Sequence, residues 1–104
     1  MLTAEQAVVL RDLFVQSLEQ EYETTKKVLA AVPEGQLDFK LGEKGRTARE
    51  LMFHIMESDA WFGNGIASLT FAEWQESTTP ATKADLLAWY EKHVPQQFAR
   101  VRAL

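Results

Sequence analysis

Apolar residues recur at steps of three and four along the first third of the chain, which is the spacing of one face of an α-helix. This pattern predicts a helix from Thr3 to about Val32. Thr3 and Gln6 fit a capping box at its start, and Pro33 with Gly35 ends the pattern. The predicted buried stripe consists of Ala7, Leu10, Phe14, Leu18, Tyr22, Leu29 and Val32.

Segment 33–46, PEGQLDFKLGEKGR, has three glycines and several charges, which is typical of a connection. Its apolar residues Leu37, Phe39 and Leu41 alternate as in a β-strand. No other segment of the chain alternates in a way that would provide a pairing strand. We therefore expect an extended loop whose three apolar side chains lie on the helices.

A second helix is predicted from Thr47, where Thr47 and Glu50 form another capping box, to about Phe62. Gly63-Asn64-Gly65 is expected to stop it. Its apolar residues cover more than one stripe, so the helix should be buried on most sides. Periodicity makes His54 a core histidine, because it shares one face with Leu51, Ile55, Ser58, Trp61 and Phe62.

The remaining chain predicts one short capped turn and a third helix. The turn falls at residues 70–74, with Phe71 and Trp74 tucked inward. The third helix opens at Thr82, and Pro95 should kink or split it near His93. Its expected buried stripe is Leu86, Tyr90, Val94, Phe98 and Val101.

These elements predict an all-α fold with three main helices. Their apolar surface is too wide for three helices to close by themselves, so a fourth helix is needed. That helix would come from the same chain or from a partner chain. We interpret the sequence either as a piece of a longer protein or as a short form of the fold.

Composition excludes several functional classes. The 104 residues make one domain, residues 1–104, and 46% of them are apolar. The net charge of −4 argues against a nucleic-acid partner, and the absence of cysteine excludes disulfides and thiolate metal ligands. Neither a signal peptide nor an apolar run of membrane-spanning length is present, so we expect a cytoplasmic protein without a membrane partner.

The chain resembles the DinB/YfiT-like superfamily at a series of short motifs. These are Phe39-Lys40-Leu41-Gly42-Glu43-Lys44, Arg46-Thr47-Ala48, Glu50-Leu51, His54-Ile55 and Trp61-Phe62. The long first helix, the loop and the order of elements agree as well. Leu41 stands where proline is common, which is a minor departure. The resemblance covers nearly the whole chain.

The resemblance implies an up-down-down-up four-helix bundle that commonly pairs as a homodimer. It implies a divalent metal, zinc or nickel, held by three histidines. His54 occupies the position of the first ligand, and the other two belong to an H-x-x-x-H pair on the fourth helix. Characterised relatives are metal-dependent enzymes, several of which use low-molecular-weight thiols in transferase or isomerase reactions on small molecules.

The sequence departs from this pattern because it has only two histidines and no H-x-x-x-H pair. His93 precedes a proline on the third helix and matches no ligand position of the family. A metal on His54 would therefore need donors from Glu57, Ser58, Asp59, His93, water or a second copy of the chain. We expect this chain alone to have little or no enzymatic activity.

Several other residues near His54 have two readings. Glu57 and Asp59 are expected to be solvated charges, although Glu57 at i+3 can reach His54. Ser58 and Trp61 are candidate pocket-lining residues, with helix packing as the alternative for both. Tyr90 and His93, three apart, form a weaker candidate acid–base pair.

Two functional hypotheses follow from these observations. The first is the three-helix part of a DinB-like metal-dependent enzyme, with His54 as one ligand. The second is a metal-free helical module that forms a homodimer through its open apolar faces.

Overall fold

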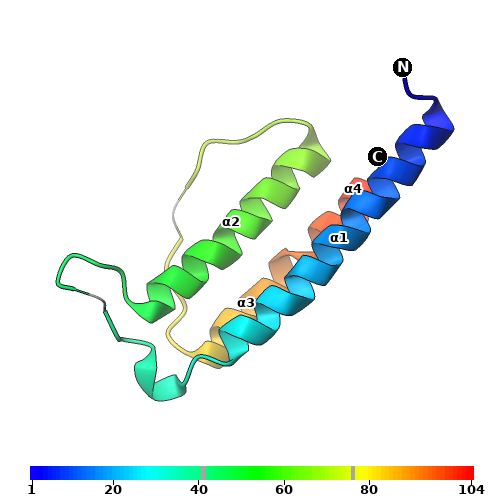
Figure 1. Cartoon of the computed structure of the whole chain (residues 1–104). Coiled ribbons are helices and arrows are strands. Elements are labelled where there is room, and N and C mark those ends of the chain that lie inside the picture. Colours follow the sequence, from blue (N-terminus) through cyan, green and yellow to red (C-terminus); the bar gives the residue numbers. More distant parts are fainter. Residues whose placement is uncertain (41, 76) are drawn as a thin grey trace.

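The computed structural model describes residues 1–40, 42–75 and 77–104. Within them lie α1 (Ala4–Ala30), a short 3-10 helix η1 (Glu34–Gln36), α2 (Ala48–Ser68), α3 (Lys83–His93) and α4 (Pro95–Arg102). Figure 1 shows α3 and α4 running as one bent rod beside α1, with α2 set apart from α1. Both α1 and α2 pack mainly on α3 and α4 rather than on each other. The described residues form no strand, so the all-α prediction is confirmed.

Three helix starts were predicted, at Thr3, Thr47 and Thr82, and all three are confirmed. The Thr3 and Gln6 side chains each accept a backbone N–H of the other residue, at 3.1 and 2.9 Å. Thr47 and Glu50 form the same reciprocal pair at the start of α2. These bonds satisfy backbone donors that a helix start otherwise leaves without partners.

The third predicted helix divides at Pro95, as expected. The interruption falls at Val94, and Pro95 takes the first turn of α4, where its missing N–H costs nothing. Every member of the predicted stripe is buried, which confirms it as the central part of the core: Leu86, Tyr90, Val94, Phe98 and Val101. The rest of the core comes from Val15, Tyr22, Leu29, Leu37, Met52, Phe53 and Met56.

The predicted stop of the second helix at Gly63-Asn64-Gly65 is wrong, because α2 continues to Ser68. Both glycines are buried inside the helix. A Cβ atom on Gly63 would lie 2.8 Å from the Cβ of Gln97 on α4, and one on Gly65 would overlap the ring of Phe71. The glycines therefore permit close packing against α4 and the following loop.

The actual end of α2 is at Leu69, which has a left-handed backbone with φ of 60°. Glycine usually occupies this position, since a side chain there is strained.

We expect Leu69→Gly to raise the free energy of unfolding by about 1 kcal/mol. Little burial is lost, because the residue is 79% exposed. Urea denaturation followed by circular dichroism measures the gain. Leu69→Ala, which keeps a Cβ, should not show it, and an equal gain in both variants would exclude backbone strain as the cause.

The two connections follow the predictions only in part. In the first, Leu37 is buried as expected, Phe39 is 57% exposed, and Leu41 lies outside the described residues. The carbonyls of Leu37 and Phe39 accept from the first N–H groups of α2, which fixes the loop backbone on the helix start and leaves the Phe39 ring outside. In the second, residues 70–74 form no helical turn. Phe71 is half-exposed and Trp74 is half-buried against α2.

The first half of α1 is less buried than its pattern predicted. Leu10 and Phe14, both assigned to the buried stripe, are about half-exposed. The Arg11 guanidinium donates to the Leu104 carbonyl at 2.8 Å, so α4 and its last residues reach only this level of α1. The earlier turns of α1 extend past them (Figure 1). Within the described ranges, no helix is both long and apolar enough to cross a bilayer.

Candidate functional site

His54 lies on the exposed side of α2, so its prediction as a core residue is wrong. The helix instead turns Met52, Phe53 and Met56 toward α3 and α4, and these three are buried. That choice of buried face rotates His54 toward solvent. Its ring borders a shallow pocket of about 100 Å³ between α2 and the loop that precedes α3. The pocket is lined by Arg46, Glu50, Phe53, His54, Glu57, Trp74, Ser77 and Thr79.

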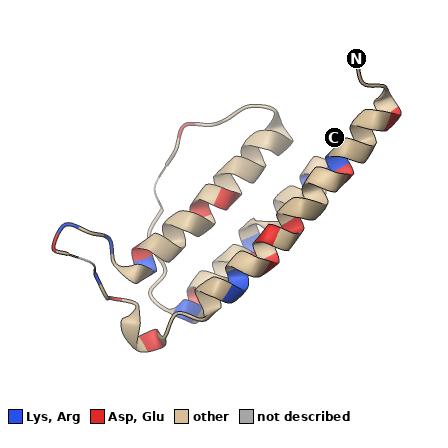
Figure 2. Ribbon diagram, in the orientation of Figure 1, with Lys and Arg blue, Asp and Glu red and all other residues tan. Residues whose placement is uncertain are grey.

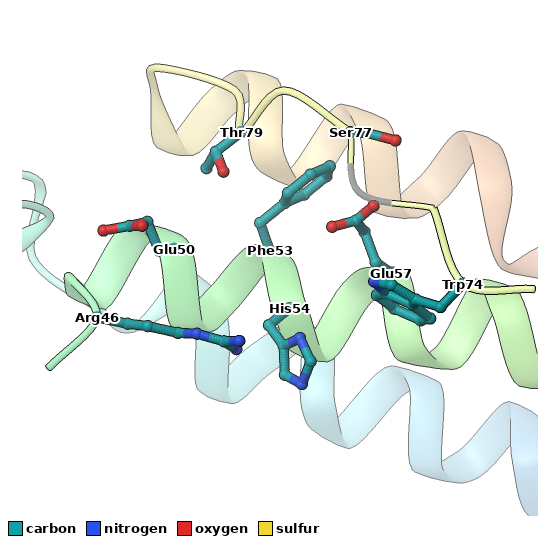
Figure 3. Close-up of a pocket in the computed structure, with 8 residues that line it drawn as sticks. All are labelled: Arg46, Glu50, Phe53, His54, Glu57, Trp74, Ser77 and Thr79. Carbon is teal, nitrogen blue, oxygen red and sulfur yellow. The ribbon is translucent and has the colours of Figure 1, made fainter.

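The side chains around His54 differ in charge and direction (Figure 3). The Arg46 guanidinium extends along the helix toward His54, and the indole of Trp74 lies 5.8 Å from the imidazole, centroid to centroid. Glu57 points toward Ser77, to the opposite side of α2 from the His54 ring in this view. Glu57 is only half-exposed, so its prediction as a solvated charge holds in part.

Ser58 and Trp61 lie next to His54 along a second, open groove of about 450 Å³, which Asp59, Phe62 and Trp74 complete. The Ser58 hydroxyl donates to the His54 backbone carbonyl at 2.7 Å, and the Trp61 indole N–H donates to the Ala72 carbonyl at 2.9 Å. Trp61 also contacts the rings of Phe71 and Trp74, so it holds the loop onto α2. A role for Ser58 and Trp61 in substrate binding stays a prediction.

The candidate acid–base pair of Tyr90 and His93 is not formed. Tyr90 is fully buried, and its hydroxyl donates to the Asp59 carboxylate at 2.5 Å. His93 stacks on Trp89, with ring centroids 4.3 Å apart. The two side chains therefore have separate partners, although they share α3.

The bond between Asp59 and Tyr90 is the feature that sequence reasoning missed. Asp59 is half-buried and its carboxylate accepts from the buried Tyr90, so its prediction as a solvated charge is wrong. Burial raises the pKa of Asp59, the Tyr90 hydrogen bond opposes that rise, and the nearby Glu21 adds to it. Burial and then the Asp59 bond raise the pKa of Tyr90. One feature of the sequence indicates that Asp59 is partly buried. It lies one turn from Ile55 and from Gly63, on an otherwise apolar strip of the helix.

The residues around His54 do not fit the divalent metal site that the resemblance implies. Within residues 1–40, 42–75 and 77–104, no three His, Asp or Glu side chains come together in a way that could hold a metal ion. Glu57 points away from His54, and the Arg46 cation points toward it. A bound divalent ion would be repelled by this guanidinium and would have one protein ligand instead of the usual three or four.

Fold and site together define an all-α protein in which three main helices carry an exposed histidine on the second helix. The family model described as "DinB family" matches residues 1–104. The chain therefore belongs to the DinB family, which confirms the resemblance at the level of the family. Comparisons with curated proteins and with solved structures gave no match.

Proposed function

We propose that this DinB-family chain is a helical association module in which two copies pair through the outer face of α1. A strip of apolar side chains on the first half of α1 carries the proposal. Each member is between 43% and 57% exposed, although a solvated helix face is usually polar. The strip, here called the α1 face, consists of Val9, Leu10, Leu13 and Phe14 of α1 together with Leu2, which precedes the helix.

The charge pattern of the α1 face favours a second copy as its partner. A two-fold interface brings the same surface from both chains together, so a charged face would repel itself. Gln6 and Ser17, which lie on this side of the helix, are uncharged, whereas Glu5 lines the same surface as Leu2, Val9 and Leu10. Arg11 points away from the face to the Leu104 carbonyl. Figure 2 shows fewer charged residues on the first half of α1 than on its second half, with one acidic residue in the first turn.

The free energy available from hydrophobic burial is of the same order as the cost of association. Full burial of a leucine or phenylalanine side chain is worth about 1.5–3 kcal/mol, and roughly half of that remains available at each position of the α1 face. Ten such side chains meet in a dimer, against a cost of association of about 4–15 kcal/mol. Hydrophobic burial can therefore support a dimer, provided that the two faces meet along most of their length.

We keep the metal-dependent hypothesis within this proposal, but only in a restricted form. His54 is accessible from solvent, and the family resemblance makes it one ligand of a zinc or nickel site. Its missing ligands would have to come from outside the described residues of one chain. We therefore assign His54 no catalytic step, and the grooves beside it no substrate, in the chain by itself.

Size-exclusion chromatography with light scattering tests the association. The wild-type chain should elute with about twice the chain mass of 11.8 kDa. Leu13→Glu should give a monomer with unchanged helical content, because it places a charge in the centre of the α1 face. Thr24→Glu, an exposed position further along the same helix, should remain dimeric.

Two outcomes would contradict the proposal. A wild-type monomer at high micromolar concentration would show that the α1 face does not drive self-association. A dimer that forms only with added zinc, and that His54→Ala abolishes, would support a metal-bridged pair of chains instead. Equal dimerisation of wild type and His54→Ala without metal is the expected result.

A further inference from the structure

The pocket beside His54 lies on the side of α2 that faces the connection to α3. None of the described residues that line it belongs to α1, so it is separate from the α1 face and from the surface between α1 and α2. Two aromatic rings and two hydroxyls are among its lining groups, from Phe53, Trp74, Ser77 and Thr79. A cavity of about 150 Å³ admits benzene. At about 100 Å³, this shallow pocket suits a small molecule rather than a macromolecular partner.

The charged side chains of this pocket divide by sign between its two sides (Figure 3). The Arg46 guanidinium extends along the helix toward His54 on one side. The Glu57 carboxylate points to the other side, toward Ser77, and the Glu50 carboxylate lies on that side as well. The pocket therefore presents a cation at one side and carboxylates at the other.

Two of these charges are available to a ligand. Arg46 and Glu57 form no ion pair and no side-chain hydrogen bond with any other residue that the structure describes. Their charged neighbours do have partners: Glu50 accepts from the Thr47 N–H, Arg49 donates to the Pro80 carbonyl, and Lys40 donates to the Glu43 carbonyl. Glu57 is also half-buried, so its carboxylate has lost part of its water and gains from a cationic partner.

We propose that this pocket binds as its ligand a small zwitterion with a carboxylate at one end and an ammonium group at the other. The carboxylate accepts from Arg46, the ammonium group donates to Glu57, and the carbon chain between them lies against the aromatic rings. A plain anion would be repelled by the two glutamates, and a plain cation by Arg46. A ligand with both charges meets an opposite charge at each side.

The spacing of the two sides favours charges at the ends of a short chain. The Arg46 side chain extends toward His54, which lies three residues before Glu57 on α2. Three residues correspond to about 4.5 Å along a helix axis. The carboxylate and ammonium group of glycine are on adjacent carbons and span less than this. We therefore expect a ligand such as 4-aminobutyrate to fit better than glycine.

A titration followed by NMR tests this inference on the full chain. The probes are 4-aminobutyrate, butyrate, which lacks the ammonium group, and butylamine, which lacks the carboxylate. Shifts of the Trp74 indole N–H report on the pocket, because this residue lines it. We expect 4-aminobutyrate to bind at least about five-fold more tightly than either single-charge analogue, as one further solvent-accessible ion pair supplies. No shift of the Trp74 signal, or equal affinities for the three probes, would overturn the inference.

Two variants assign the charges. Arg46→Gln should lower the affinity for 4-aminobutyrate to that for butylamine, and Glu57→Gln should lower it to that for butyrate. Lys44→Gln and Glu73→Gln are the matched controls, because each makes the same change of charge at an exposed position outside the described lining. They should keep the wild-type preference, and a preference that survives in both pocket variants would contradict the proposed contacts. Leu13→Glu should bind 4-aminobutyrate as wild type does, which separates this pocket from self-association.

Discussion

Tyr90→Phe is expected to lower the free energy of unfolding at pH 7 by about 1–2 kcal/mol, although it removes a single oxygen atom. The Tyr90 hydroxyl donates to the Asp59 carboxylate at 2.5 Å, and Tyr90 is fully buried. Its removal leaves a half-buried carboxylate without this donor. Urea denaturation of both proteins at pH 7 measures the loss. Tyr22→Phe is the matched control, because it removes a hydroxyl from the ring that stacks on Tyr90 and keeps the bond to Asp59.

The loss of stability caused by Tyr90→Phe should depend on pH. The Asp59 carboxyl determines the direction of that dependence. Burial raises the pKa of Asp59 in the folded protein above its unfolded value. Its contribution to stability is therefore fully present below the unfolded pKa of about 4 and is lost as pH rises through the folded pKa. The Tyr90 bond limits this effect, since it favours the ionised carboxylate. Tyr90→Phe should consequently cost more at pH 7 than at pH 4.

Asp59→Asn provides the complementary measurement. Because asparagine does not ionise, the difference in stability between this variant and wild type should shift in favour of the variant as pH rises from 4 to 7. The comparison is made as a difference because other groups titrate in the same range. Glu19, whose pKa is lowered by its hydrogen bond with Arg102, contributes with the opposite sign. A difference that is constant with pH would show that Asp59 is not desolvated in the fold.

The helix starts and the third-helix stripe were predictable because both depend on local chemistry. A threonine with a glutamine or glutamate three residues later satisfies backbone donors in any surroundings. The steps from Leu86 to Val101 leave one narrow apolar stripe, so only one face of that helix can be buried. Pro95 interrupts the helix for a covalent reason that no tertiary contact removes.

The orientation of α2 was not predictable in this way. Apolar residues surround most of the helix, so periodicity offers several faces of similar hydrophobicity. The structure buries the face of Met52, Phe53 and Met56, and that tertiary choice exposes His54. The Asp59–Tyr90 bond depends on the same choice, because it joins residues 31 positions apart on two helices. The sequence predicts that His54 lies on α2, but it does not predict which side chains surround His54.

The end of α2 shows how a residue type can be read in two ways. Glycine terminates helices when it takes a left-handed backbone, and the pair at 63 and 65 suggested that use. In the structure both are helical, and Leu69 takes the left-handed position. Sequence alone gives no sign of these close approaches, because Gln97 of α4 is distant in the chain from Gly63 and the path of the loop that carries Phe71 depends on tertiary packing. A buried glycine in a helix is therefore a packing feature here.

Gly63→Ala is expected to lower the free energy of unfolding by up to about 2 kcal/mol, although alanine is the better helix former. Helix propensity favours alanine by about 1 kcal/mol, whereas overpacking a tight contact costs about 1–3 kcal/mol. Overpacking should win, because the added Cβ would lie 2.8 Å from the Cβ of Gln97 and 3.1 Å from its Cγ. A Cβ is fixed to its backbone, so α2 and α4 must move apart to relieve the contact.

Gly65→Ala on the same helix is the control for this prediction. Its added Cβ would meet the ring of Phe71, a half-exposed residue of the loop that can swing away. Thermal and urea denaturation should therefore show little loss for Gly65→Ala and a clear loss for Gly63→Ala. The loss from Gly63→Ala should shrink in a Gln97→Gly background, where the opposing Cβ is absent. If Gly63→Ala is as stable as wild type, the close approach of α2 and α4 is not what requires glycine at position 63.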